Sequence, residues 1–220
     1  MAAPRFILPA EGTFAPNGDA DPLPFYYRPL VGRIYIARIN TALSLVEGRF
    51  RRRLEIGYGS GLLMPTLATI SDELCGADIA AEPPTLRPVL ARLGVTPKEI
   101  VRADVQGLPF PEGYFDGVVA LSILEHLKRD HLDRAAREVA RVLGPGGRFL
   151  VACPAVHPVM NLAFAAIGFA AIERFHFSGL RDVLAATSPY FTLERKAALP
   201  RLIPLPMGWA LYGAVLLRKR

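Results

Sequence analysis

Three glycines alternate with larger residues in the segment LEIGYGSG, at residues 54–61. Such alternation makes a poor strand and no helix, and it fits a tight turn where the backbone passes close to a bulky partner. The glycines are Gly57, Gly59 and Gly61, and Glu55 precedes the first of them by two residues. A loop of this kind between a strand and a helix can present backbone N–H groups to a ligand.

Two further carboxylates follow apolar runs that have the character of strands. Asp78 ends the run after the glycine loop, and Asp104 ends the next one. A carboxylate at the end of the second strand can accept hydrogen bonds from the hydroxyls of a ribose. The dinucleotide form of the loop, GxGxxG, needs glycine at position 62, where this chain has Leu62. The spacing therefore favours a nucleoside-containing ligand other than NAD.

The elements that must position these residues alternate along the chain. Strands are expected at 52–57, 73–79, 99–105, 115–122 and 148–154, and helices at 62–71, 85–95 and 132–143. This rhythm predicts a parallel sheet with helices on both faces, in which the loops after the strands share one edge. Farther along, we expect a helix at 178–187 with Ser178 as its N-cap, and strands at 191–199 and 209–219.

The N-terminal part has a different pattern. Residues 1–24 lack periodicity and are expected to form a loose arm. Residues 29–47 predict a helix with one apolar face, formed by Leu30, Ile34, Ile39, Leu43 and Val46. We therefore divide the chain into an arm and lid helix at 1–48 and a main domain at 49–220, with a substrate lid from 155–190.

Composition bounds the class of protein. The chain has 220 residues, 51% of them hydrophobic, which is enough for one domain with a sizeable core. Its two cysteines, Cys75 and Cys153, have no CxxC spacing, so we expect neither a disulfide framework nor a metal site. No signal-peptide pattern is visible, and the expected location is cytoplasmic.

The net charge of +6 is unevenly distributed, with +4 in residues 1–53, −3 in 54–153 and +5 in 154–220. The densest basic cluster, Arg49 with Arg51, Arg52 and Arg53, precedes the first strand. It should therefore lie opposite the ligand edge of the sheet, as a solvated face. Nucleic acid is not expected as a partner, whereas the basic flanks leave open a weak peripheral contact with membranes. The apolar core of the longest uncharged stretch, 162–172, is too short to span a bilayer.

Five segments together carry a family resemblance. They are LEIGYGSG, GADI, ADVQGLPFPEGYFD, ALSILEHL and AREVARVLGPGGRFLVACP, in this order over residues 53–154. In order and spacing they resemble the class I S-adenosylmethionine (SAM)-dependent methyltransferases, in the group called methyltransferase type 11. The resemblance implies SAM as cofactor. It also implies a doubly wound, Rossmann-like α/β fold with a seven-stranded sheet, mostly parallel, whose last strand is antiparallel. In that strand order Cys75 and Cys153 lie too far apart to pair.

The resemblance also implies roles at the cofactor. Glu55 would order the loop beneath the methionine part, and Gly57, Tyr58, Gly59 and Gly61 would wrap SAM. Asp78 and Ile79 would lie at the ribose, Asp104 and Val105 at the adenine, and Leu121 and Ser122 beside the sulfonium. Tyr58 departs from the smaller residue common at its position, and we expect it to pack over the cofactor or the N-terminal helix.

The acceptor is less defined by the sequence. The motif LSIL after the fourth strand lacks the Asn/Asp-Pro-Pro-aromatic pattern of enzymes that methylate nucleic-acid bases. His126 and His157 are candidate bases. Tyr26, Tyr27, His157 and His176 are candidate substrate contacts, in regions rich in aromatic residues. A hydrophobic small molecule or lipid-like compound, methylated on an O, N or C atom, is the expected acceptor.

Two other functional classes remain open. The first is a non-catalytic module that keeps the fold and binds SAM or a partner. The second is a nicotinamide-dependent oxidoreductase, which Leu62 and the absence of a Tyr-x-x-x-Lys dyad disfavour. The sequence leaves the oligomeric state open.

Overall fold

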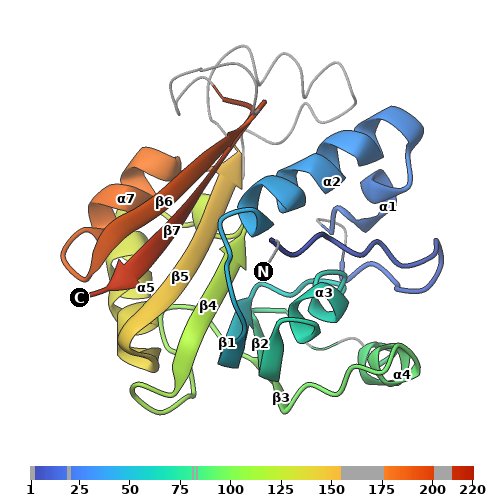
Figure 1. Ribbon diagram of the computed structural model, residues 1–220, viewed down its shortest axis with the longest axis horizontal. Helices are drawn as coiled ribbons and strands as arrows, with labels where there is room; N and C mark the ends of the chain where they lie inside the picture. Colours follow the sequence, from blue (N-terminus) through green and yellow to red (C-terminus); the bar gives the residue numbers. More distant parts are fainter. Residues whose placement is uncertain (1–2, 19–20, 81, 83, 155–175, 201–209) are drawn as a thin grey trace.

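The computed structural model describes residues 3–18, 21–80, 82, 84–154, 176–200 and 210–220. Its centre is a seven-stranded sheet in the order β3-β2-β1-β4-β5-β7-β6 (Figure 1). The strands are β1 (Phe50–Ile56), β2 (Ser71–Asp78), β3 (Glu99–Arg102), β4 (Phe115–Leu121), β5 (Leu143–Pro154), β6 (Phe191–Leu199) and β7 (Tyr212–Lys219). β7 is antiparallel to β5 and β6, and the other neighbouring pairs are parallel. The predicted fold class is confirmed.

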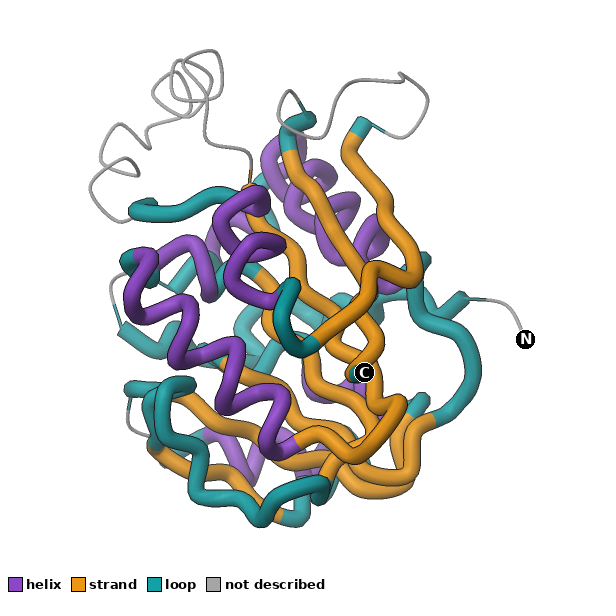
Figure 2. The backbone as a smooth tube through the Cα atoms, turned by 90° about the vertical axis from the view of Figure 1, so that its left-hand side faces the viewer, coloured by secondary structure: helices purple, strands orange, loops and turns teal. Residues whose placement is uncertain are grey.

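Helices cover both faces of this sheet (Figures 1 and 2). They are α1 (Leu23–Tyr26), α2 (Pro29–Leu43), α3 (Met64–Ala68), α4 (Leu86–Arg92), the 3₁₀ turn η1 (Leu124–His126), α5 (Arg129–Val142) and α7 (Leu180–Thr187). Side chains of β5 alternate between the two cores: Leu150 and Ala152 pack with α2, α3 and α4, and Phe149 and Val151 pack with α5 and α7. This period of two is what a sheet buried on both faces requires.

The N-terminal segment is not a loose arm, and that prediction was wrong. Phe6, Phe14 and Leu23 are buried in the same core as α2, α3 and α4. The backbone N–H of Phe6 donates to Asn40 Oδ1 at 2.9 Å, and that of Ile7 donates to Thr66 Oγ1 at 2.9 Å. Single aromatic residues between prolines and glycines fill separate core positions, so the segment is ordered without any periodicity in its sequence.

The helix expected at 29–47 is α2, which ends earlier, at Leu43. Ile39, Leu43 and Val46 are buried as predicted, but Leu30 and Ile34 are 76% and 45% exposed. The apolar face was therefore only partly correct. The first turns of α2 extend past the strand ends, so they have no sheet beneath them to cover those two side chains (Figure 1).

Smaller differences concern the ends of elements. Gly179, not Ser178, occupies the N-cap of α7, and its N–H donates to Asp182 Oδ2 at 2.9 Å. Ser178 instead donates its hydroxyl to the carbonyl of Leu127 at 2.6 Å. Cys75 and Cys153 are free and buried, as expected. Among the described residues, no helix has both the length and the apolar character to cross a bilayer.

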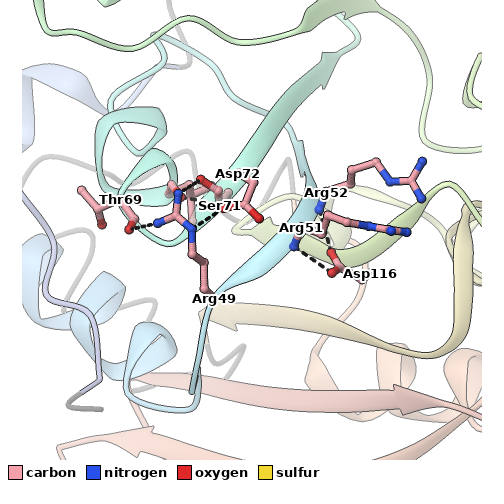
Figure 3. Close-up of polar contacts among 8 residues, drawn as sticks. Arg49, Arg51, Arg52, Thr69, Ser71, Asp72 and Asp116 are labelled. Carbon is pink, nitrogen blue, oxygen red and sulfur yellow. Dashed lines mark hydrogen bonds and ion pairs between the residues drawn. The ribbon is translucent and has the colours of Figure 1, made fainter.

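The arginine cluster lies at the start of β1, with Arg49 just before the strand and Arg51, Arg52 and Arg53 within it, so it is at the end of the sheet away from the strand C-termini (Figure 3). Arg49 pairs with Asp72 and donates to the carbonyl oxygens of Thr69 and Ser71. The backbone N–H groups of Arg51 and Arg52 donate to the Asp116 carboxylate at 2.8 and 2.9 Å. These contacts are local and structural.

Arg53 departs from the solvated face that we expected of this cluster. It is 1% exposed, its guanidinium lies 3.8 Å from the centre of the Phe50 ring, and its Nε and Nη1 have no hydrogen-bond partner among the described residues. Burial lowers its pKa to about 9, against the opposing charges of Asp116 and Glu55. The sequence did not reveal this, because Arg53 is the last of three consecutive arginines, and only the strand places its side chain on an inward position.

We predict that Arg53→Met raises the free energy of unfolding at pH 7 by roughly 1–4 kcal/mol, because an apolar side chain of similar length removes a buried, poorly paired cation. Urea unfolding at pH 7 measures the change. Arg51→Met, at an exposed side chain, is the control, and a destabilised Arg53→Met variant would contradict the prediction.

Candidate active site

The glycine loop lies directly after β1 and has a backbone that other residues rarely adopt. Gly57, Gly59 and Gly61 all have positive φ angles, of 72°, 52° and 84°. A Cβ atom at Gly57 would lie 2.0 Å from Cδ1 of Ile123, and one at Gly61 would lie 2.4 Å from Cδ1 of Leu86. Glycine is therefore needed in this loop for two reasons. The turn requires positive φ angles, and at Gly57 and Gly61 neighbouring side chains leave no room for a Cβ atom.

Asp78 holds this loop from the neighbouring strand. Its Oδ2 accepts a hydrogen bond from the N–H of Gly59 at 2.9 Å, and its Oδ1 accepts one from the N–H of Ala80 at 2.8 Å. The N–H of Gly57 donates to the carbonyl oxygen of Ala77 at 2.7 Å, which extends the pairing of β1 with β2. An ionised carboxylate has about four acceptor sites, so Asp78 can accept further bonds from a ligand.

The N-terminal segment reaches the same loop. Asn17 Nδ2 donates to the carbonyl oxygen of Gly59 at 3.2 Å, and the N–H of Asn17 donates to Asp21 Oδ2 at 2.9 Å. Asp21 Oδ2 would lie 3.4 Å from a Cβ atom on Gly59. The sequence does not indicate either residue, because they occur in a segment without periodicity.

Glu55 lies on β1, two residues before the loop, and is 4% exposed. Its Oε2 has no hydrogen-bond partner among the described residues. Burial raises its pKa well above the usual value, and the charge of Asp78 adds to this, whereas Arg53 opposes it. A cationic ligand at the loop would offset the cost of this buried carboxylate.

The remaining predicted cofactor residues differ in exposure. Ile79 is 68% exposed, an unusual position for an apolar side chain beside a carboxylate such as Asp78. Asp104 is exposed and accepts a hydrogen bond from the N–H of Gln106 at 2.9 Å, and Val105 is buried. Tyr58 is 3% exposed, and a Cβ atom on Gly76 of β2 would lie 2.9 Å from its ring. A cofactor contact by the Tyr58 ring thus stays a prediction.

A second polar cluster lies where β4 and β5 end. Ser122, which follows Leu121 at the end of β4, has a φ of 59° although it is not glycine. Its Oγ accepts a hydrogen bond from Arg38 Nη2 at 2.7 Å and lies 3.0 Å from the Tyr212 hydroxyl. The Arg38 guanidinium stands over the rings of Tyr35 and Tyr212, at 4.7 and 4.6 Å from their centres. α2, β4 and β7 thus meet at Ser122.

Arg38 and Tyr212 were not identified from the sequence. Arg38 lies three residues after Tyr35 and one before Ile39, both buried, so a charged residue on the buried face of a helix was the available signal. Tyr212 begins an apolar strand, and nothing local distinguishes it from a core residue. Burial raises the pKa of the Tyr212 phenol, which therefore stays protonated at neutral pH.

The residues predicted to contact the acceptor do not all lie close to one another. Tyr26 packs edge-on against Tyr35 with ring centres 5.2 Å apart, close to Arg38. The Tyr27 hydroxyl donates to the carbonyl oxygen of Pro9 at 3.1 Å, so it is engaged by the N-terminal segment. His126 and His176 do come together, with ring centres 5.2 Å apart.

The two histidines differ in environment, and a third is not described. His126 is exposed at the end of η1, and His176 is half-buried. Burial lowers the pKa of His176 to about 4, with smaller effects from the nearby His126 and Arg38. His157, together with most of the predicted lid at 155–190, lies outside the described residues.

A family model and two relatives that match parts of this chain are named as methyltransferases. The family model described as Methyltransferase domain matches residues 54–151, slightly less than half of the chain. Sterol 4-C-methyltransferase strm-1 of Caenorhabditis elegans is 35% identical over 100 residues, which cover 44% of this chain and 29% of that protein. The ubiquinone/menaquinone biosynthesis C-methyltransferase UbiE of Pseudomonas savastanoi pv. phaseolicola is 35% identical over 126 residues, covering 54% and 48%. The chain spans less than half the length of these curated relatives.

The fold also has solved counterparts. The N-methyltransferase NodS of Bradyrhizobium japonicum, in complex with S-adenosyl-L-homocysteine, superposes with a TM-score of 0.64 over 92% of this chain and 94% of that one. Its sequence is 17% identical, so this likeness concerns the fold alone.

SAM fits the site that the residues form. The loop has the backbone freedom to approach a ligand, Asp78 keeps acceptor capacity, and the buried Glu55 lacks a partner for Oε2 among the described residues. The matched segment, 54–151, contains all of these groups. Over this segment, the chain is similar to SAM-dependent methyltransferases.

Proposed function

We propose that the protein transfers the methyl group of SAM to an O, N or C atom of a hydrophobic small molecule or lipid-like compound. The observation that carries the proposal is the glycine loop held by Asp78, with the buried carboxylate of Glu55 beside it. The match to a methyltransferase domain over this segment supports it.

The proposed cofactor contacts are those that the family resemblance implies. Asp78 accepts hydrogen bonds from the ribose hydroxyls, and the exposed side chain of Ile79 covers the adjoining base. Asp104 and the backbone of Val105 read the adenine. Glu55 balances the positive charge of the ligand from beneath the loop. These roles come from the family resemblance, and the geometry above is compatible with each.

When bound, SAM supplies a methyl group that its sulfonium has already activated. The task left to the chain is alignment, and orientation alone can contribute roughly 7–11 kcal/mol in favourable cases. We assign the alignment of the acceptor to the cluster of Ser122, Arg38 and Tyr212. In this cluster the side chains of Arg38 and Tyr212 hold Ser122, whose backbone has a positive φ. Arg38 has further N–H donors for an oxygen of the acceptor.

An apolar acceptor suits the surroundings of the cluster of Ser122, Arg38 and Tyr212. Phe25, Tyr26 and Tyr35 stack next to Arg38, and the exposed Leu30 and Ile34 continue the apolar surface along α2. The names of two relatives, a sterol C-methyltransferase and a ubiquinone/menaquinone biosynthesis C-methyltransferase, also refer to apolar compounds. The proposal places the reaction in the cytoplasm, with membrane contact limited to the basic flanks of the chain.

A base is needed only when the acceptor must lose a proton before or during transfer. His126, exposed and just beyond β4, is the candidate among the described residues. His157, which the sequence also suggests as a candidate base, lies outside the described residues. Incubating the protein with methyl-labelled SAM and a panel of sterols, quinols, phenols and amines tests the activity. Tight SAM binding without turnover on any class of acceptor would instead favour a non-catalytic binding module.

We predict that Asp78→Asn weakens SAM binding roughly 10- to 100-fold, because the amide loses hydrogen bonds made by a charged acceptor. Equilibrium dialysis with labelled SAM measures the change. Asp133→Asn on α5 is the control, since Asp133 is exposed and lies on the other side of the sheet. Equal affinity in the two variants would remove the ribose role from Asp78.

Gly57→Ala should reduce SAM affinity by roughly tenfold or more, because the added Cβ collides with Ile123 and displaces the loop. Gly94→Ala is a closely matched control: Gly94 has a φ of 73°, compared with 72° at Gly57, but nothing lies within 4 Å of its Cβ position. Both variants should lose a similar backbone contribution, about 1–2 kcal/mol. Titration calorimetry on both separates backbone strain from the loop's own role, and unchanged binding by Gly57→Ala would contradict the prediction.

A further inference from the structure

Two distant segments are joined at the end of β4 by backbone hydrogen bonds. The N–H groups of Phe177 and Ser178 donate to the carbonyl oxygen of Glu125 at 2.8 and 3.2 Å. The Ser178 hydroxyl donates to the carbonyl oxygen of Leu127 at 2.6 Å. These bonds hold the backbone next to His176 against η1, so the pairing of His176 with His126 is built into the fold.

Glu125 is an anomaly within this junction. It is 0% exposed, and neither carboxylate oxygen has a hydrogen-bond partner of normal geometry among the described residues. His126 has the largest favourable electrostatic effect on this carboxylate, followed by the Arg38 guanidinium, which itself donates to Ser122, and the Cys153 thiol lies within reach of a weak hydrogen bond. A buried carboxylate without a partner is costly, so natural proteins rarely keep one without a ligand or counter-charge.

The three side chains converge. One ligand atom from each of Glu125, His126 and His176 can be chosen so that all three lie within 4.8 Å of one another. Ligand atoms at about 2.0–2.2 Å from a zinc ion lie roughly 3.2–3.5 Å apart in tetrahedral geometry. The set must therefore close by about 1–1.5 Å, which rotation of an exposed and a half-buried imidazole can supply.

We propose that Glu125, His126 and His176 form a binding site for a divalent transition-metal ion, of the class represented by Zn²⁺, Fe²⁺ and Mn²⁺. Two imidazoles and one carboxylate are a ligand set that such ions accept while keeping open coordination positions. The ion stabilises the buried Glu125 carboxylate, and it lies at the same edge of the sheet as Ser122. His126 then acts as a metal ligand and not as a base.

The site bears on the acceptor as well. Open coordination positions at this edge favour an acceptor that carries an oxygen donor, such as a hydroxyl group. This last step rests on the proposed function, whereas the metal site itself does not. The two can therefore fail separately, because metal binding is measured without SAM or acceptor.

The test is calorimetric titration of tag-free, chelator-treated protein with Zn²⁺, and separately with Mn²⁺ and Mg²⁺. One equivalent of Zn²⁺ should bind, and Glu125→Gln, His126→Ala and His176→Ala should each weaken it by at least ~10–100-fold. Glu125→Gln preserves the shape of the side chain and removes its charge. Co²⁺ titration followed by visible absorption reports whether imidazole and carboxylate ligands surround the ion.

His131→Ala is the matched control, since His131 is the other described histidine and lies 3.5 Å from Asp130 on the surface of α5. It should bind Zn²⁺ like the wild type. If Glu125→Gln fails to fold, His176→Ala still decides, because His176 is not a core residue. Absence of Zn²⁺ and Mn²⁺ binding, or affinity unchanged in His176→Ala, would overturn the proposal. Metal binding by a protein that does not bind SAM would refute only the proposed function.

Discussion

The hydrogen bond between the N–H of Gly59 and the carboxylate of Asp78 is the contact on which the candidate site depends. It forms because β1 and β2 pair in parallel, with Ile56 opposite Ala77, so that the loop after one strand meets the residue that ends the other. The loop can reach that carboxylate only with left-handed backbone at its three glycines. Both the N-terminal segment and Ile123 then pack onto the loop. Sheet register, glycine placement and loop packing thus lead to one arrangement.

Buried charge is the second feature that links fold and site. Arg53, Glu55 and Glu125 are all nearly inaccessible, and each has polar side-chain atoms without a partner among the described residues. Most folds avoid such groups, because the loss of hydration exceeds what distant charges return. Glu55 and Glu125 lie towards the carboxyl end of the parallel strands, where open α/β sheets bind ligands, whereas Arg53 lies deeper in β1. We interpret the two carboxylates as groups held for cationic ligands, and Arg53 as a local cost in stability.

The sequence predicted the sheet and its cofactor edge because both depend on local patterns. Apolar runs of strand length, punctuated by Gly57, Asp78 and Asp104, indicate where strands end, and parallel strands bring those ends together. The roles of individual residues at SAM came from resemblance and stay predictions. Burial of Phe6 and Phe14 could not be predicted, because a segment without periodicity reveals nothing about the contacts of single aromatic residues.

The acceptor side depends more on long-range contacts, which the sequence pattern predicts less well. Arg38, Ser122 and Tyr212 come from three elements separated by 84 and 90 residues, and their meeting follows from the crossing of α2 over β4 and β7. Likewise, the sequence does not distinguish Glu125 beside His126, because the burial of Glu125 depends on distant elements, β5 and α7, that contact η1. Such clusters are visible only once the topology is known.

The central claim is that this chain uses the Asp78-anchored loop to bind SAM. Its most direct test is calorimetric titration of the wild-type protein with SAM, with S-adenosylhomocysteine and with NAD. The account predicts saturable micromolar binding of the two sulfur nucleosides in one-to-one ratio and no binding of NAD. A folded protein that binds neither SAM nor S-adenosylhomocysteine, or that binds NAD in their place, would contradict it.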